Sequence, residues 1–396
     1  MAPIKVLVVG DGRSSARARK GISFAGGVDR NRDAFTVTEF VYLLEHAPAQ
    51  DISVQTAHRS DDPNAAFPNF DFRSERLRDY DVLWLFGFEG NNDGAVHGTP
   101  IADGEVAAVF DFMNAGGGVF ATGDHSGMGS FMCGRIPRVR TMRKWFGVEY
   151  RPIDAPTHAL DWRGEVVTAA NWPAKSVPGG LDRADTLVFN PRGGIAADGT
   201  LVRDTESLYQ FDNQSDDIAQ TLVLDAPVHD ILRRADGAPI TRFPDHMHEG
   251  EVVTPADLEA VVAPRDTPVP EYPSADGVRP APRVIATGTA TAGHSVALTA
   301  DPCLSADPPG DPAPSVAMTL GILCAYDGLP AGVGRIVTDS SFHHYVDVNL
   351  IGDPCGSTPD RRRGFGVPYH PPVPGSVLAD LGTCYVNTVR WLAGSG

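Results

Sequence analysis

Residues 115–129 read AGGGVFATGDHSGMG, a glycine-rich approach to a short apolar stretch that ends on Asp124 and His125. Residues 80–88, YDVLWLFGF, come one helix-length earlier and have the same uninterrupted apolar character. Such runs are typical of strands that are buried on both faces of a parallel sheet. Because glycines permit a tight turn where the second strand ends, we expect Asp124 and His125 to face a cleft.

The alternation of strand-like and helix-like segments extends outward from these two runs. Strands are expected at residues 4–11, 51–57, 80–88 and 117–124, and helices at residues 35–46, 104–114 and 138–146. This order predicts an α/β fold with a doubly wound, mostly parallel sheet of flavodoxin-like type and helices on both faces. We expect a single domain over residues 1–396.

The pattern changes after about residue 150. Residues 150–262 are rich in turns and short strands, and residues 262–314 contain too many prolines for regular helix. We therefore expect a β-rich middle segment followed by a proline-rich insertion outside the core. Order is predicted to return with a helix at 315–326, SVAMTLGILCAY, a strand at 334–342, GRIVTDSSF, and an amphipathic helix at 377–394.

Composition narrows the class of protein. Hydrophobic residues make up 42% and charged residues 21% of the 396 residues, which indicates a globular chain. The formal net charge of −17 disfavours nucleic acid or an anionic membrane as a partner. The N-terminus lacks the apolar core of a signal peptide, so we expect a cytoplasmic protein. The five cysteines are widely spaced without a C-x-x-C pair and are expected to be reduced, with a disulfide between Cys303 and Cys355 as the alternative.

Three short windows concentrate the ionisable side chains: residues 123–129, 243–252 (FPDHMHEGEV) and 338–349 (TDSSFHHYVDVN). Loops at the carboxyl edge of a parallel sheet converge, so the windows are expected to share one cleft. Mixed nitrogen and oxygen ligands suit Zn²⁺ or Fe²⁺, and the candidate ligands of a single ion are His125, His246, His248, Glu249, His343 and His344. The candidate catalytic groups are Asp124, His125, Glu251 and Asp339. The alternative is that these histidines are merely hydrogen-bonded or surface groups.

Candidate substrate-binding residues lie in neighbouring segments. Glu89 and Ser126 follow the two expected strands at residues 80–88 and 117–124. Arg135 and Arg138 belong to a basic run at residues 133–146, CGRIPRVRTMRKWF, whose guanidinium groups suit an anionic group of the substrate. The alternative is a solvated helix face that balances local negative charge.

The order of YDVLWLFGF, a helix and AGGGVFATGDHSG resembles the class I glutamine amidotransferase-like superfamily, in particular its ThuA-like branch. The late segment AYDGLPAGVGRIVTDSSFHH, residues 325–344, is similar to the same branch, which implies a histidine near the site. The resemblance covers residues 4–125 and 315–394. Where true glutamine amidotransferases carry a nucleophilic cysteine, this chain reads GDHSG at 123–127, so a thiol glutaminase is not expected. The superfamily also includes an iron-dependent amidase.

We therefore expect a hydrolase, metal-assisted, that cleaves an amide or ester bond of a small polar substrate without a nucleotide cofactor. A metal-bound water would be the nucleophile, with Glu251 or Asp339 as general base. The alternative is a non-catalytic ThuA-like module that binds a sugar or another polar ligand in the same cleft. The sequence predicts no oligomeric state.

Overall fold

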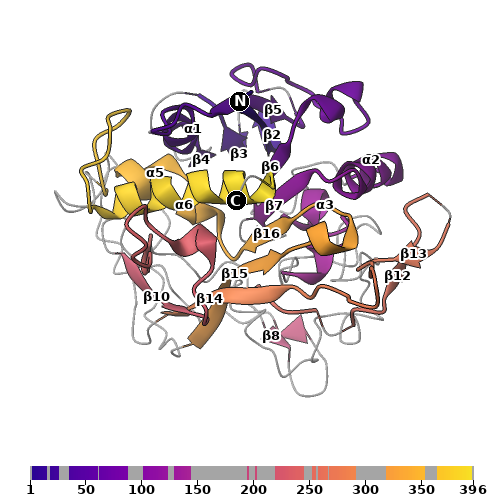
Figure 1. Ribbon diagram of the computed structural model, residues 1–396. Coiled ribbons are helices and arrows are strands. Elements are labelled where there is room, and N and C mark those ends of the chain that lie inside the picture. Colours follow the sequence, from indigo (N-terminus) through magenta and orange to yellow (C-terminus); the bar gives the residue numbers. More distant parts are fainter. Residues whose placement is uncertain are drawn as a thin grey trace.

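A large mixed sheet runs through the middle of the molecule (Figure 1). The computed structural model describes residues 2–15, 18–25, 35–60, 62–87, 101–123, 129–143, 194–195, 201–202, 219–244, 252–255, 257–265, 267–290, 318–352 and 364–394. Among these residues, nine strands form the sheet in the order β11-β10-β14-β15-β16-β7-β6-β1-β5.

One half of the sheet is parallel and the other half is antiparallel. The parallel half contains β5 (Ile52–His58), β1 (Ile4–Gly10), β6 (Val82–Gly87), β7 (Gly118–Gly123) and β16 (Ile336–Asp339). The antiparallel half adds β15 (Met318–Tyr326), β14 (Arg283–Ala290), β10 (Gln220–Leu224) and β11 (Arg242–Phe243). The α/β class predicted from sequence is confirmed, whereas a mostly parallel sheet is not.

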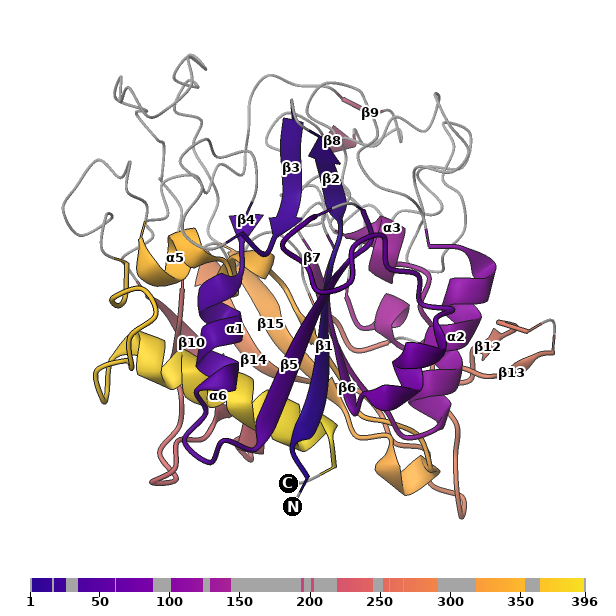
Figure 2. The ribbon, with the colours of Figure 1, turned by 90° about the horizontal axis from the view of Figure 1, so that it is seen from above.

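Helices cover both faces of the parallel half, as Figure 2 shows. Helices α1 (Thr38–Glu45) and α6 (Val377–Leu392) lie on one face, and α2 (Asp103–Asn114) lies on the other. Successive strand residues alternate between two hydrophobic cores: Trp84 packs on the α1/α6 side, and Leu83 and Leu85 pack on the α2 side. Because both sides are covered, all six residues of β6 are buried, which explains the continuous apolar run in the sequence.

Two sequence predictions are wrong in the second half of the chain. Of the helix expected at 315–326, residues 318–326 form strand β15 instead, and residues 320–326 of this strand are buried. A short apolar run that is covered on both faces has no periodicity that separates a strand from a buried helix. The proline-rich segment 262–314 is not wholly outside the core, because its residues 283–290 form β14 between β10 and β15.

The remaining elements are short. They are β2 (Gly12–Ser15), β3 (Ala18–Ser23), β4 (Phe35–Thr36), β8 (Gly194–Ile195), β9 (Leu201–Val202), β12 (Val261–Val262), β13 (Val269–Pro270), α3 (Ser130–Cys133), α5 (Asp347–Ile351) and the 3₁₀ turns η1 (Glu75–Asp79), η2 (Val139–Thr141), η5 (Asp230–Leu232), η6 (Leu329–Ala331) and η7 (Phe342–His344). Instead of the helix expected from residue 138, the chain forms η2 and then a bridge between Arg143 and Val252. No helix in the described part of the chain is long and apolar enough to cross a membrane.

Glycines close the carboxyl edge of the parallel half tightly. Gly129 has φ of 76°, and a Cβ placed on Gly87 would lie 2.6 Å from the Cα of Gly129. A Cβ on Gly129 would in turn lie 3.1 Å from the Cα of Gly123. The ends of β6 and β7 and the start of α3 therefore meet at a spacing that side chains would prevent.

Candidate functional site

A carboxylate–imidazole pair stands where β16 ends beside β7. Asp339 is the last residue of β16, and the 3₁₀ turn η7 brings His344 back toward it. The Nδ1 atom of His344 lies 2.7 Å from Oδ1 of Asp339, and both side chains are fully buried. Ser341 starts the turn by accepting the His343 N–H with its hydroxyl.

Two further donors fix the Asp339 carboxylate. The Tyr345 hydroxyl donates to Oδ2 at 2.6 Å, and the Ser341 N–H donates to Oδ1 at 3.0 Å. Burial, followed by the charge of Asp339, raises the pKa of Tyr345 well above its ordinary value, so this hydroxyl keeps its proton. Because these donors hold its two oxygens, the carboxylate is placed to orient His344. The role of general base expected for Asp339 stays a prediction.

The Nε2 atom of His344 is the unused polar atom of this pair. It is buried and has no hydrogen-bond partner within the described ranges. The ring is held in place by Phe243, at 5.1 Å between ring centroids, and the Tyr385 hydroxyl donates to the backbone carbonyl of His344. A buried polar atom without a partner is rare in native proteins, and it marks the place where a reacting group, a water or a metal would bind.

Arg143 joins the ends of β7 and β16. Its guanidinium donates to the carbonyls of Asp339 (2.8 Å), Ser340 (2.8 Å) and Gly123 (2.9 Å), and the residue is 1% exposed. The basic run at 133–146 contained Arg143, but nothing in its spacing indicated this contact. Tyr345 and Tyr385 were also missed, although Tyr345 directly follows the predicted histidine pair.

The described end residues of the windows 123–129 and 243–252 lie next to the Asp339–His344 pair and Arg143. Gly123, the residue before Asp124, is bound by Arg143, and Phe243 stands two residues before Asp245. At the far end of that window, Val252 is bridged to Arg143. The predicted site residues Glu89, Asp124, His125, Ser126, His246, His248, Glu249 and Glu251 themselves lie outside the described residues.

His343 contacts a different partner from His344. Its Nδ1 atom lies 2.7 Å from Oδ1 of Asn349 in α5, and its ring packs against Phe35 and Phe342. Across the described parts of the chain, no three His, Cys, Asp or Glu side chains are grouped so that they could hold a metal ion. The metal site predicted from sequence stays a prediction, because four of its six proposed ligands fall outside these parts.

The two arginines predicted to bind substrate contact protein groups instead. Arg138 is buried, and its Nε and Nη2 atoms donate to the Glu271 carbonyl and to Oδ1 of Asn114. Arg135 donates to the Ile101 carbonyl and pairs with Asp103. Because Arg138 is 1% exposed, a solvated helix face does not describe it. Its proposed contact with substrate stays a prediction.

Two buried acidic residues, Glu39 and Asp347, lie close together at the start of α1. Their pairing was not predicted from sequence. The Asp347 carboxylate accepts the Glu39 N–H (2.8 Å) and the Thr38 hydroxyl (2.6 Å), so it caps this helix from a distant segment. Burial raises the pKa of Glu39 to about 7, and the Asp347 carboxyl adds to the shift although the Tyr369 N–H opposes it. Burial raises the pKa of Asp347 as well.

Glu39 is expected to make stability depend on pH. The pKa of Glu39 is 4.5 in the unfolded chain and about 7 in the folded protein, so the unfolded state loses this proton more readily. Glu39 therefore has no effect on stability below pH 4.5 and destabilises the fold increasingly as the pH rises toward 7. The unfolding free energy of Glu39→Gln minus that of wild type should therefore be about 2–3 kcal/mol larger at pH 8 than at pH 5. Urea unfolding at the two pH values measures this. Glu45→Gln, at an exposed position of the same helix, is the control and should show no such gain.

Comparison with known protein families finds no family model that matches the chain, and comparison with curated proteins finds no match either. The ThuA-like resemblance therefore stays a prediction.

Proposed function

We propose that the protein is a hydrolase of small polar amides or esters, and that His344 acts at the carboxyl edge of the parallel strands. The observation that carries this proposal is the Asp339–His344 pair with its unused, buried Nε2 atom. Hydrogen-bonded carboxylate–imidazole pairs whose second ring nitrogen is left for the reaction serve acyl-transfer enzymes on unrelated folds.

The residues support a general-base mechanism. With Nδ1–H donated to Asp339, the Nε2 lone pair of His344 takes a proton from the attacking water or hydroxyl as the new C–O bond forms at the substrate carbonyl. Asp339 stabilises the imidazolium that results. The same proton then passes from Nε2 to the leaving alcohol or amine as the ester or amide bond breaks, which restores neutral His344.

The same pair also suits a metal-assisted form of the proposal. A metal-binding histidine commonly donates its other ring N–H to a carboxylate, and Nδ1 of His344 lies 2.7 Å from Oδ1 of Asp339, where it would make such a bond. A bound divalent ion would supply a water of lowered pKa. Of the six proposed ligands, His343 and His344 lie among the described residues, and His344 would hold such an ion through Nε2.

The test is hydrolysis of a panel of small esters and primary amides by wild type and by His344→Ala, before and after addition of Zn²⁺ or Fe²⁺. The proposal requires wild type to release carboxylic acid from at least one member of the panel. A wild-type protein that hydrolyses none of them, with or without metal, would favour the non-catalytic ligand-binding module.

A further inference from the structure

A pocket of about 710 Å³ opens at the opposite edge of the sheet from His344. Tyr80 and Asp81, which directly precede β6, line it together with Gly116 and Gly117, which directly precede β7. The six residues of each of these strands separate the pocket from the carboxyl edge by about 20 Å. The pocket is therefore a site apart from the proposed hydrolase centre.

The walls of the pocket combine apolar and aromatic side chains with charged ones. Phe72 and Leu77 come from the segment around η1, whereas Ala108 and Phe112 come from α2. Gly116, with φ of 98°, leaves open space where a side chain would otherwise stand. A pocket of this volume has the size of those that take small organic molecules, and its mixed lining suits a ligand with both an apolar ring and a charged group.

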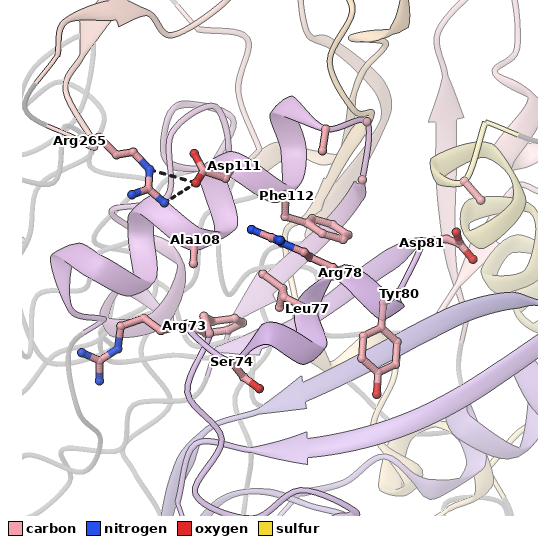
Figure 3. Close-up of a pocket in the computed structure, with 15 residues that line it drawn as sticks. Arg73, Ser74, Leu77, Arg78, Tyr80, Asp81, Ala108, Asp111, Phe112 and Arg265 are labelled. Carbon is pink, nitrogen blue, oxygen red and sulfur yellow. Dashed lines mark hydrogen bonds and ion pairs between the residues drawn. The ribbon is translucent and has the colours of Figure 1, made fainter.

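Three arginines surround the opening, and they differ in how their charge is balanced. Arg265 pairs with Asp111, and Arg73 pairs with Asp71. Figure 3 shows the Asp111–Arg265 pair on one side, Asp81 on the opposite side and Arg78 between them. Asp81 accepts the backbone N–H of Lys5 at 2.8 Å. Within the described residues, Arg78 has neither an ion-pair nor a hydrogen-bond partner.

We propose that this pocket binds a small aromatic oxyanion, whose ring packs between Leu77 and Phe112 and whose anionic group pairs with Arg78. A planar guanidinium donates two parallel hydrogen bonds to a carboxylate or phosphate, and such charge-assisted bonds are about twice as strong as neutral ones.

Phenyl phosphate is the probe, and isothermal titration of the full chain is the measurement. Arg78→Ala should weaken binding by about tenfold or more, because a charge-assisted pair is lost. Ala108→Phe should abolish binding by filling the space beside Phe112. Arg76→Ala is the matched control, since Arg76 lies on the same turn η1 but stacks on Phe67, 4.7 Å from its ring centroid, and does not line the pocket. Its affinity should stay within about twofold of wild type.

Absence of binding to wild type at about 5 mM phenyl phosphate would overturn the proposal, as would equal affinities of the Arg78 and Arg76 variants. Inorganic phosphate that binds as tightly as phenyl phosphate would overturn the role given to the aromatic walls. The inference does not rest on the hydrolase proposal, because His344→Ala should bind phenyl phosphate as wild type does.

Discussion

His344→Ala is expected to lower kcat/KM for the hydrolysed ester or amide by about 10³-fold while the fold persists. The reason is that Nε2 of His344 carries the proton in both halves of the proposed reaction, whereas this atom makes no hydrogen bond within the described ranges. Loss of the ring therefore removes the group that transfers the proton, whereas Asp339 keeps its hydrogen bonds from Tyr345 and Ser341.

Two further variants separate this role from a general effect on packing. Tyr345→Phe removes one donor to Asp339 and should lower kcat by about tenfold with KM unchanged, as expected for a positioning residue. His370→Ala changes an exposed histidine and should leave activity within about twofold. If His344→Ala retains activity within about threefold of wild type, His344 is not the general base.

Arg143→Ala should produce the largest loss of stability among single changes at this edge, about 3–5 kcal/mol. It leaves the carbonyls of Gly123, Asp339 and Ser340 without the guanidinium that now binds them, although the Thr122 hydroxyl still donates to the Asp339 carbonyl. A buried polar group that is left without a partner costs about 1–3 kcal/mol. Because these carbonyls belong to the ends of β7 and β16, activity should fall as well.

Arg265→Ala is the comparison for Arg143, since it breaks an ion pair whose two side chains are 64% and 49% exposed. Exposed pairs contribute about 1 kcal/mol or less, so this variant should unfold close to wild type in urea. Equal destabilisation by the two substitutions would show that Arg143 does not hold the strand ends together.

The first half of the fold could be predicted from sequence because its strands are covered on both faces by helices. The continuous apolar runs of β1, β6 and β7 follow directly from that burial, and α6 shows its amphipathic pattern. The antiparallel half could not, because β15 pairs with β14 across a long intervening segment and local patterns do not record such pairing. For the same reason, strand β14 could not be predicted within the proline-rich segment 262–314.

The sequence indicated that ionisable side chains of the candidate site gather at one edge of the sheet. It did not indicate how these side chains contact one another. The strand predicted at 334–342 contains Asp339 and is followed by two histidines, which indicated ionisable groups at the sheet edge. The structure ends this strand at Asp339 and places Asp339 and His344 in contact there. It takes the 3₁₀ turn at residues 342–344 to bring His344 onto Asp339, and it takes α6 to bring Tyr385 to the His344 carbonyl. Neither contact has a signal in the residue spacing.

The tautomer of His344 is the most direct test of the central claim, which is that Asp339 holds this ring with Nε2 free to accept a proton. ¹⁵N NMR of histidine-labelled protein at pH 8, with His344 assigned by its absence in His344→Ala, resolves which ring nitrogen is protonated. We expect a protonated Nδ1 and an unprotonated Nε2, and a redistribution of the proton in Asp339→Asn. If wild-type His344 carries its proton on Nε2, it is not the general base, because that nitrogen then has no lone pair with which to begin the reaction.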